Sequence, residues 1–124
     1  MKKIEELENF CSLGSIDAKK IIEAEKKLGI KFAKEYKKII SKYGIISCNG
    51  HELTGICNSK RLNVVDVTLK ERENSTNTNN LYVIEEANID DIVIWQDSDG
   101  IVYITKNRSN PQKISNSIVE YINN

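Results

Sequence analysis

The feature that most constrains the fold is a change of hydrophobic periodicity at Gly44. Before this glycine, apolar residues recur at the spacing of an amphipathic helix, first over residues 18–28 and again over residues 32–43. Gly29 follows the first stripe and Gly44 follows the second, and each is placed to end a helix in the left-handed conformation. We therefore predict two neighbouring helices joined by a short link, with Ser15 as the N-cap of the first.

After Gly44 the pattern becomes one of short apolar or β-branched runs separated by turn residues. The clearest predicted strands are LYVIEEA, IVIWQ and IVYIT, and the weaker ones are IISC, HELTGIC and LNVVDV. We predict one or two helical turns for TLKERE, a polar surface loop for residues 74–80 and a second loop for NRSNPQK. The closing segment ISNSIVEYIN predicts a helix with Ile114, Ile118, Tyr121 and Ile122 on one face.

Helices followed by strands and then by a helix predict an α+β fold rather than an alternating α/β fold. In this fold the N-terminal helices and a C-terminal helix pack on a mainly antiparallel sheet. Residues 1–124 match the size of one typical domain, and we expect a core over about residues 14–123.

Composition excludes several classes of protein. No apolar run approaches the roughly 20 residues that a membrane-spanning helix needs, and MKKIEELENF lacks the apolar core of a secretory signal. The three cysteines, Cys11, Cys48 and Cys57, form no C-x-x-C pair, which favours reduced thiols over a disulfide framework. We therefore expect a cytoplasmic protein that does not enter a membrane.

The charge is balanced over the chain but unevenly distributed along it. The formal net charge is zero, so no overall field attracts nucleic acid. Residues 1–44 hold eleven lysines and seven acidic residues, a net charge of +4, which leaves −4 for the remainder. Residues 81–104 contain no Lys or Arg and six acidic residues: Glu85, Glu86, Asp90, Asp91, Asp97 and Asp99. These residues form either a solvated face of the sheet or a surface for a basic partner.

The sequence DSDG at 97–100 raises the question of a metal site. A calcium loop of the EF-hand type needs a glycine at its sixth position and a bidentate Glu at its twelfth. Here Gly100 is fourth from Asp97, and an apolar strand pattern follows it. An Asp-Gly pair between two such runs is typical of a β-hairpin, so we predict a turn.

Zinc binding and nucleophilic catalysis would have to use Cys11, Cys48, His51 and Cys57. Structural zinc sites bring their ligands in closely spaced pairs, and Cys48 with His51 is one such pair. The chain contains no G-x-S-x-G, P-loop, G-x-G-x-x-G or papain-like cysteine signature. A small enzyme using Cys48 or Cys57 with His51 is one hypothesis, but we expect no enzyme, no metal and no cofactor.

The predicted helix pair could also suggest a DNA-binding helix-turn-helix. The second helix carries Lys34, Lys37, Lys38 and Lys42 but no Arg, Asn or Gln to read base edges. We predict a solvated lysine face and no direct binding of nucleic acid. Glu25 lies inside the first apolar stripe, where a carboxylate must be hydrogen-bonded. We expect it to accept bonds from loop amides or a Tyr hydroxyl and to lock the helices to the sheet.

Six stretches, taken in order, resemble the SUKH superfamily over residues 14–123. They are IIEAEKKLGIKFAKEYKKIISKYG, ELTGIC, VVDVT, VIEE, DSDGIVYI and SIVEYI. This group includes a fungal cell-wall-assembly regulator and many bacterial immunity proteins. The positions that match the family pattern are Glu25, Leu28, Gly29, Tyr36, Tyr43, Gly44, Gly55 and the pair Asp99-Gly100.

The resemblance implies a non-enzymatic protein of the bacterial immunity branch, which binds and neutralises a co-encoded polymorphic toxin, for example a nuclease. Toxins that act on nucleic acid tend to be basic, so the acidic segment would steer the toxin and cover its substrate surface. The expected contact residues are Glu52, Glu85, Glu86, Asp90, Asp91, Trp95, Asp97 and Asp99, with Trp95 either an interface anchor or a core residue. The alternative is a regulatory protein–protein interaction scaffold of the cell-wall-assembly type. We expect a monomer or a weak dimer.

Overall fold

The computed structural model describes residues 1–87 and 89–124, and within them the chain forms four α-helices and two antiparallel sheets. This arrangement confirms the predicted α+β class. The helices are α1 (Ala18–Leu28), α2 (Lys34–Tyr43), α3 (Val64–Arg72) and α4 (Ile118–Asn123), preceded by the 3-10 turn η1 (Ile4–Glu6). The strands are β1 (Cys11–Ser12), β2 (Ile46–Cys48), β3 (His51–Glu52), β4 (Tyr82–Glu86), β5 (Val93–Gln96), β6 (Val102–Thr105) and β7 (Gln112–Ser115). None of the described helices has the length and apolar character needed to cross a membrane.

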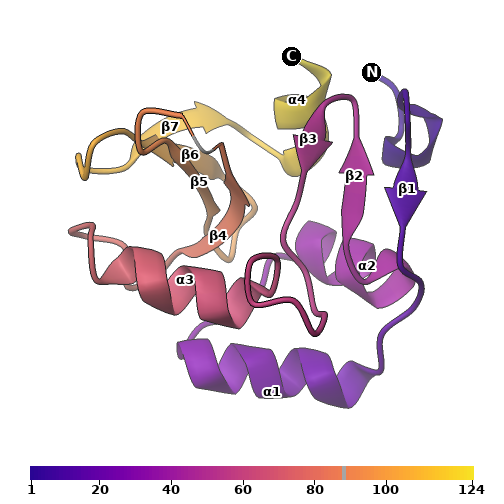
Figure 1. The fold of residues 1–124 in the computed structure, drawn as a ribbon, viewed down its shortest axis with the longest axis horizontal. Coiled ribbons are helices and arrows are strands. Elements are labelled where there is room, and N and C mark those ends of the chain that lie inside the picture. Colours follow the sequence, from indigo (N-terminus) through magenta and orange to yellow (C-terminus); the bar gives the residue numbers. More distant parts are fainter. Residues whose placement is uncertain (88) are drawn as a thin grey trace.

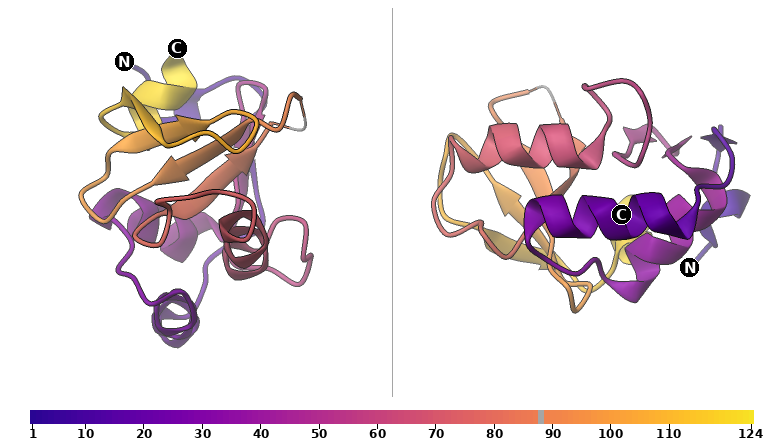
Figure 2. Two further views of the ribbon diagram at one scale, coloured as in Figure 1. Left: turned by 90° about the vertical axis from the view of Figure 1, so that its left-hand side faces the viewer. Right: turned by 90° about the horizontal axis from the view of Figure 1, so that it is seen from below.

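The two sheets stand side by side above the helices α1, α2 and α3 (Figure 1). The smaller sheet has the strand order β1-β2-β3, and the larger has the order β4-β5-β6-β7. Helix α3 packs beside β4, and α1 contacts both α2 and α3 from below (Figure 2). The two chain ends meet at the top, where the Asn123 side chain bonds the Lys2 backbone at both N (3.3 Å) and O (3.1 Å).

The first two helices end at glycines, as the periodicity predicts. Gly29 has φ = 68° and ψ = 28°, the predicted left-handed conformation. Gly44 has φ = 74° and ψ = −73°, which is not the predicted conformation, although its positive φ also favours glycine. The predicted N-cap is wrong, however. Asp17 caps α1 in place of Ser15, because its Oδ1 accepts a 3.0 Å hydrogen bond from Lys19 N.

The run VVDV, predicted as a strand, forms the first turn of α3 instead. Asn63 caps this helix, with its Oδ1 accepting from Val65 N at 2.9 Å. The Thr68 hydroxyl accepts from Val83 N in β4 at 2.9 Å and so anchors the helix to the larger sheet. Packing of the β-branched side chains against β4 therefore outweighs their intrinsic preference for strands.

The predicted C-terminal helical stripe is divided between two elements. Ile114 lies in the edge strand β7, where it is 41% exposed, and the preceding residues 112–113 are strand rather than loop. Helix α4 begins only at Ile118, because Ser117 accepts from Glu120 N at 3.0 Å and caps it. Ile118 and Ile122 are buried, as expected for a core-facing helix.

The polar loop at 74–80 joins α3 to β4. Its Thr76 hydroxyl and Asn77 amide both donate to Asn110 Oδ1, at 2.9 and 3.0 Å, which ties it to the loop between β6 and β7. Thr78 is buried, while the other residues of this loop are at least partly exposed.

An aromatic cluster of Phe32, Tyr36 and Tyr82 fills the core where the helices meet the larger sheet. The ring centroids lie 4.8–5.0 Å apart. The Tyr36 hydroxyl donates to Thr54 O at 3.1 Å, and the Tyr82 hydroxyl donates to Gln96 Oε1 at 2.6 Å. Burial raises the pKa of both tyrosines, so the hydroxyls remain protonated donors. Each buried hydroxyl has a hydrogen-bond acceptor, so its burial leaves no unsatisfied polar group.

Candidate functional site

Glu25 is buried at the corner between α1 and α2, with 4% of the residue exposed. Its Oε2 accepts a 2.8 Å hydrogen bond from Phe32 N and lies 3.4 Å from Lys37 Nζ. Its backbone carbonyl accepts from Ile30 N at 3.2 Å. The predicted bond to a loop amide is confirmed, but Glu25 joins two helices to each other rather than to the sheet.

Gly44 and Gly55, two of the motif glycines, lie in direct backbone contact. A Cβ atom on Gly55 would lie 1.9 Å from Gly44 O and 2.7 Å from Ile45 Cγ2. Ile56 N donates to the same Gly44 carbonyl at 3.2 Å. The segment after β3 can therefore cross the end of α2 only because Gly55 has no side chain.

The other aromatic and aliphatic motif residues also contribute to packing. Leu28 is buried, and its carbonyl accepts from Arg72 Nη1 at 2.9 Å. The Tyr43 ring packs edge-on against Phe10 with centroids 5.0 Å apart, and its hydroxyl donates to Glu5 Oε2 at 3.3 Å. The positions that match the family pattern thus form the framework of the fold.

The acidic residues of 81–104 do not form one patch. Asp90 and Asp91 lie in the turn before β5, and Asp97 and Asp99 lie in the turn after it. The turns that enter and leave one strand of an antiparallel sheet are at opposite ends of that strand. The two pairs of aspartates therefore belong to different surfaces.

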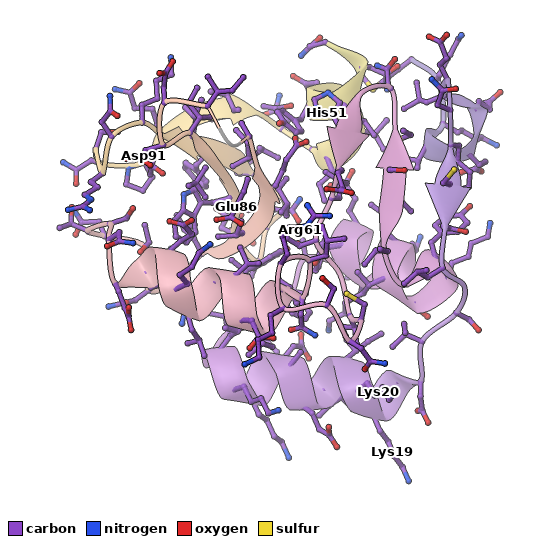
Figure 3. The ribbon with its side chains drawn as sticks, in the orientation of Figure 1. Lys19, Lys20, His51, Arg61, Glu86 and Asp91 are labelled. Carbon is purple, nitrogen blue, oxygen red and sulfur yellow. The ribbon has the colours of Figure 1, made fainter. Side chains whose placement is uncertain are left out.

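Charged residues of β3, α3 and β4 and Asp91 lie close enough for their charges to interact, and we call the acidic members of this group the acidic strip. Arg61 and Lys70 interleave with its carboxylates: Arg61 Nη1 lies 2.6 Å from Glu52 Oε1, and Lys70 Nζ lies 3.0 Å from Glu86 Oε2. Figure 3 shows Glu86 between Arg61 and Asp91 on one face of the molecule. We define the acidic strip as Glu52, Glu71, Glu86 and Asp91, together with Asp90 next to Asp91 in the chain, and Arg61 and Lys70 form ion pairs with its carboxylates.

Glu71 and Glu86 interact closely within the strip. Burial raises the pKa of Glu71 to about 7, and the hydrogen bond with Glu86 and the charges of Glu86 and Asp91 act in the same direction. Although burial opposes it, hydrogen bonds from Glu71 and Lys70 hold the pKa of Glu86 below its ordinary value. Of the two carboxyl groups, Glu71 therefore binds a proton more readily, and the approach of a further cation would lower its pKa.

The predicted hairpin is confirmed at 97–100, with β5 and β6 paired in antiparallel register. Gly100 has φ = 96° and its N–H donates to Asp97 O at 3.1 Å. Asp97 Oδ1 accepts from the amides of Asp99 (2.9 Å) and Ile101 (3.0 Å), and its Oδ2 accepts from the Tyr103 hydroxyl at 2.8 Å. Asp97 therefore builds the turn, whereas Asp99 is exposed and leaves its carboxylate to solvent.

Trp95 does not lie on a surface that could contact a partner. It is fully buried in a small cluster with Leu81 and Val83. Its Nε1 donates to Thr105 Oγ1 at 2.9 Å, so the polar end of the ring is satisfied inside the protein. The prediction of Trp95 as an interface anchor is therefore wrong, and its core alternative is correct.

Glu85 is also unsuited to direct contact, because only 7% of it is exposed. Its Oε1 accepts from the Tyr121 hydroxyl and lies 2.9 Å from His51 Nδ1, while its Oε2 accepts from Glu52 N at 3.1 Å. The carboxylate thus connects β4 with β3 and α4. The sequence prediction of Glu85 as a contact residue is corrected to a structural role.

Cys48 pairs with His51 across the β2–β3 hairpin, so Cys48, His51 and Glu85 resemble a nucleophile, a base and an orienting acid. A reactive cysteine needs a lowered pKa and access to substrate. Cys48 is 2% exposed, and burial together with the charge of Glu85 raises the pKa of its thiol. Within residues 1–87 and 89–124, no group of three His, Cys, Asp or Glu side chains is arranged to hold a metal ion.

A SUKH family model described as SMI1-KNR4 cell-wall matches residues 1–124, the whole chain. The protein belongs to the SUKH superfamily. No curated protein matches the chain. In this SUKH domain the eight positions and pairs matched to the family pattern form the backbone crossing and the helix corners. The acidic strip is built from other residues, two of which, Glu52 and Glu86, lie within the similar stretches ELTGIC and VIEE.

The sequence offered no signal for one central residue of this SUKH domain. Glu35 Oε1 accepts from Ile118 N at 2.7 Å and from Gln96 Nε2 at 3.0 Å, and its Oε2 accepts from Val119 N at 3.1 Å. One carboxylate therefore ties α2 to β5 and to the first turn of α4. Because its partners lie 61 to 84 residues away, only the tertiary structure reveals this role.

Proposed function

We propose that this SUKH protein is an immunity protein that binds and neutralises a co-encoded protein toxin in the cytoplasm, without chemistry of its own. The observation that carries the proposal is the family match over the whole chain, because the family includes immunity proteins. The raised pKa and burial of Cys48 support a binding role over a catalytic one.

The acidic strip is the proposed toxin-binding surface. Its outer members take part in solvent-exposed ion pairs: the Arg61 and Glu52 side chains are 60% and 50% exposed, and that of Lys70 is 59% exposed. Exposed pairs of this kind contribute about 0–1 kcal/mol, so a partner's cations can replace them at small cost. A basic partner would then meet carboxylates that β3, α3, β4 and the residues before β5 bring to one place.

The chemistry of the strip fits a toxin that acts on nucleic acid. Such an enzyme presents Lys and Arg to phosphates, and an acidic inhibitor can both attract that surface and cover it. Opposite charges mainly raise the association rate, and the effect weakens as salt screens it. The toxin would be inactivated because the bound protein covers the surface that contacts its substrate.

Co-expression with the product of the neighbouring gene tests this function. We expect that product to arrest growth alone and this protein to restore growth. A strip variant with Glu52→Gln, Glu86→Gln, Asp90→Asn and Asp91→Asn should restore it less well at the same protein level. If the product is harmless, or this protein leaves its toxicity unchanged, the proposal is wrong.

A regulatory scaffold is the second candidate, favoured by the cell-wall description of the matching family model. It would bind a cellular protein rather than a toxin. A gene neighbourhood without a toxin, together with recovery of one specific cellular protein in a pull-down with the tagged chain, would support this candidate.

A further inference from the structure

Three segments far apart in the sequence line an open groove of about 530 Å³ beside the first residues of the chain. They are the first five residues, the outer face of α2 and the start of α4. The floor of this groove is apolar and is formed by Ile4, Ile39, Tyr43 and Val119. Its rim carries Lys2, Lys3, Lys38 and Lys42, and we call it the basic groove.

The walls of the basic groove are held in place within the chain. Asn123 bonds the Lys2 backbone on both its N and O atoms, which fixes the N-terminal wall against α4. The Tyr43 hydroxyl donates to Glu5 Oε2 at 3.3 Å, and Lys42 Nζ stands 5.1 Å from the centroid of the Tyr43 ring. A ligand would therefore meet a groove whose shape is already set, which limits the entropy lost on binding.

The charge of the groove is markedly one-sided. Four lysines line it against one carboxylate, Glu5. A backbone hydrogen bond lowers the pKa of that carboxyl group, and the Lys42 charge, the Tyr43 hydrogen bond and the Lys3 charge act in the same direction. The lysine rim therefore has an excess of positive charge above an apolar floor.

We propose that the basic groove binds an acidic segment of a partner protein that also presents an apolar side chain. Carboxylates of the segment would pair with the lysines, and the apolar side chain would cover Ile39 and Val119. A nucleic acid would use the lysines through its phosphates but would leave this floor uncovered, so the combination favours an acidic protein segment. The proposal concerns a second surface, built from other elements and of opposite charge to the acidic strip, and it stands whether or not the partner of the strip is a toxin.

A fluorescein-labelled peptide of alternating Glu and Leu residues tests the groove by anisotropy at low salt. A matched peptide with Ser in place of Leu measures the contribution of the floor. The test variant is Lys38→Glu with Lys42→Glu. The control is Lys26→Glu with Lys27→Glu on α1, which changes the net charge equally at exposed positions away from the groove.

We expect saturable binding of the Glu/Leu peptide, with about tenfold weaker binding of the Glu/Ser peptide. The groove variant should lose about tenfold in affinity and the control no more than about twofold. The proposal is overturned if the Glu/Leu peptide does not bind, if both variants lose equally, or if oligo-dT competes as well as the peptide does. Circular dichroism of both variants establishes that they remain folded.

Discussion

Lys70 Nζ lies 3.0 Å from Glu86 Oε2 and 3.8 Å from Glu71 Oε2, so one exposed ammonium group forms ion pairs with two partly buried carboxyl groups. Burial raises the pKa of Glu71, and the neighbouring Glu86 carboxylate raises it further, while the Lys70 ammonium opposes the shift only in part. A basic side chain of a partner would supply the missing charge. The same pair therefore links the stability of the fold to the proposed binding surface.

Stability should depend on pH through Glu71. Its pKa is about 7 in the folded protein against an ordinary value of 4.5. Between these values the folded state holds a proton that the unfolded chain has released, so the free energy of unfolding falls as pH rises. We expect a loss of about 2 kcal/mol from about pH 5 to pH 8, measured by urea unfolding. Glu71→Gln should flatten this slope, and the exposed Glu73→Gln should not. Identical slopes for the wild type and Glu71→Gln would refute the assignment.

Gly55→Ala should severely destabilise the fold. The added methyl group would meet the Gly44 carbonyl oxygen at 1.9 Å, and neither backbone can yield without disturbing β3 or α2. We expect a loss of about 3 kcal/mol or more in the free energy of unfolding. Gly50→Ala is the control, because it has φ = 81° but nothing within 4 Å of the new atom, and it should lose about 1 kcal/mol. Equal losses in thermal unfolding would show that the backbone crossing is not tight.

Glu25→Ala should destabilise the protein by about 1–3 kcal/mol, because the buried Phe32 amide loses its acceptor. Glu25→Gln keeps a side-chain oxygen near that amide, so its free energy of unfolding should fall clearly less than that of Glu25→Ala. Lys37→Ala removes only a 43%-exposed partner and should change the free energy of unfolding by at most about 0.5 kcal/mol. Denaturant titration of the three variants measures their free energies of unfolding. A large loss in Lys37→Ala would show that the ion pair, rather than the bond to the Phe32 amide, is the stabilising contact of Glu25.

Asp97 and Asp99 should differ in their effect on stability, although both lie in one acidic turn. Asp97→Ala removes the acceptor of two amides and of the Tyr103 hydroxyl, so we expect a loss of about 2 kcal/mol. Asp99→Ala removes an exposed carboxylate and should stay within about 0.5 kcal/mol of the wild type. Thermal unfolding compares the two variants, and equal stability would mean that Asp97 does not build the turn.

The sequence predicts those elements whose signals are local. The stripes of α1 and α2, the glycines that end them and the Asp-Gly hairpin all follow from neighbouring residues. VVDV misled the prediction because its β-branched side chains are stabilised as a helix by contacts with β4, which lies later in the chain. Ile114 misled it because a helical spacing can arise by chance where a strand passes into a helix.

The candidate surface was predictable only in part. Six acidic residues cluster within 81–104 of the sequence, but β5 separates Asp90 and Asp91 from Asp97 and Asp99. Glu85 and Trp95 face inward, which alternation along β4 and β5 did not decide, because both faces of these strands are covered. Glu71 joins the strip from α3, with Lys70 as its neighbouring cation, and no feature of their local sequence connects them with Glu86.

The association rate constant with the purified neighbouring toxin tests the central claim most directly. For this measurement the strip variant carries only Asp90→Asn and Asp91→Asn, without the changes at Glu52 and Glu86. Both aspartates have φ near 54°, and Asn tolerates that backbone conformation. The control is Asp99→Asn with Glu23→Gln, which changes the net charge equally at exposed positions outside the strip. At low salt we predict an association rate about three- to tenfold slower for the strip variant, a much smaller change for the control, and convergence of the rates at high salt. Equal association rates for the strip variant and the wild type would contradict the claim that the acidic strip receives the toxin.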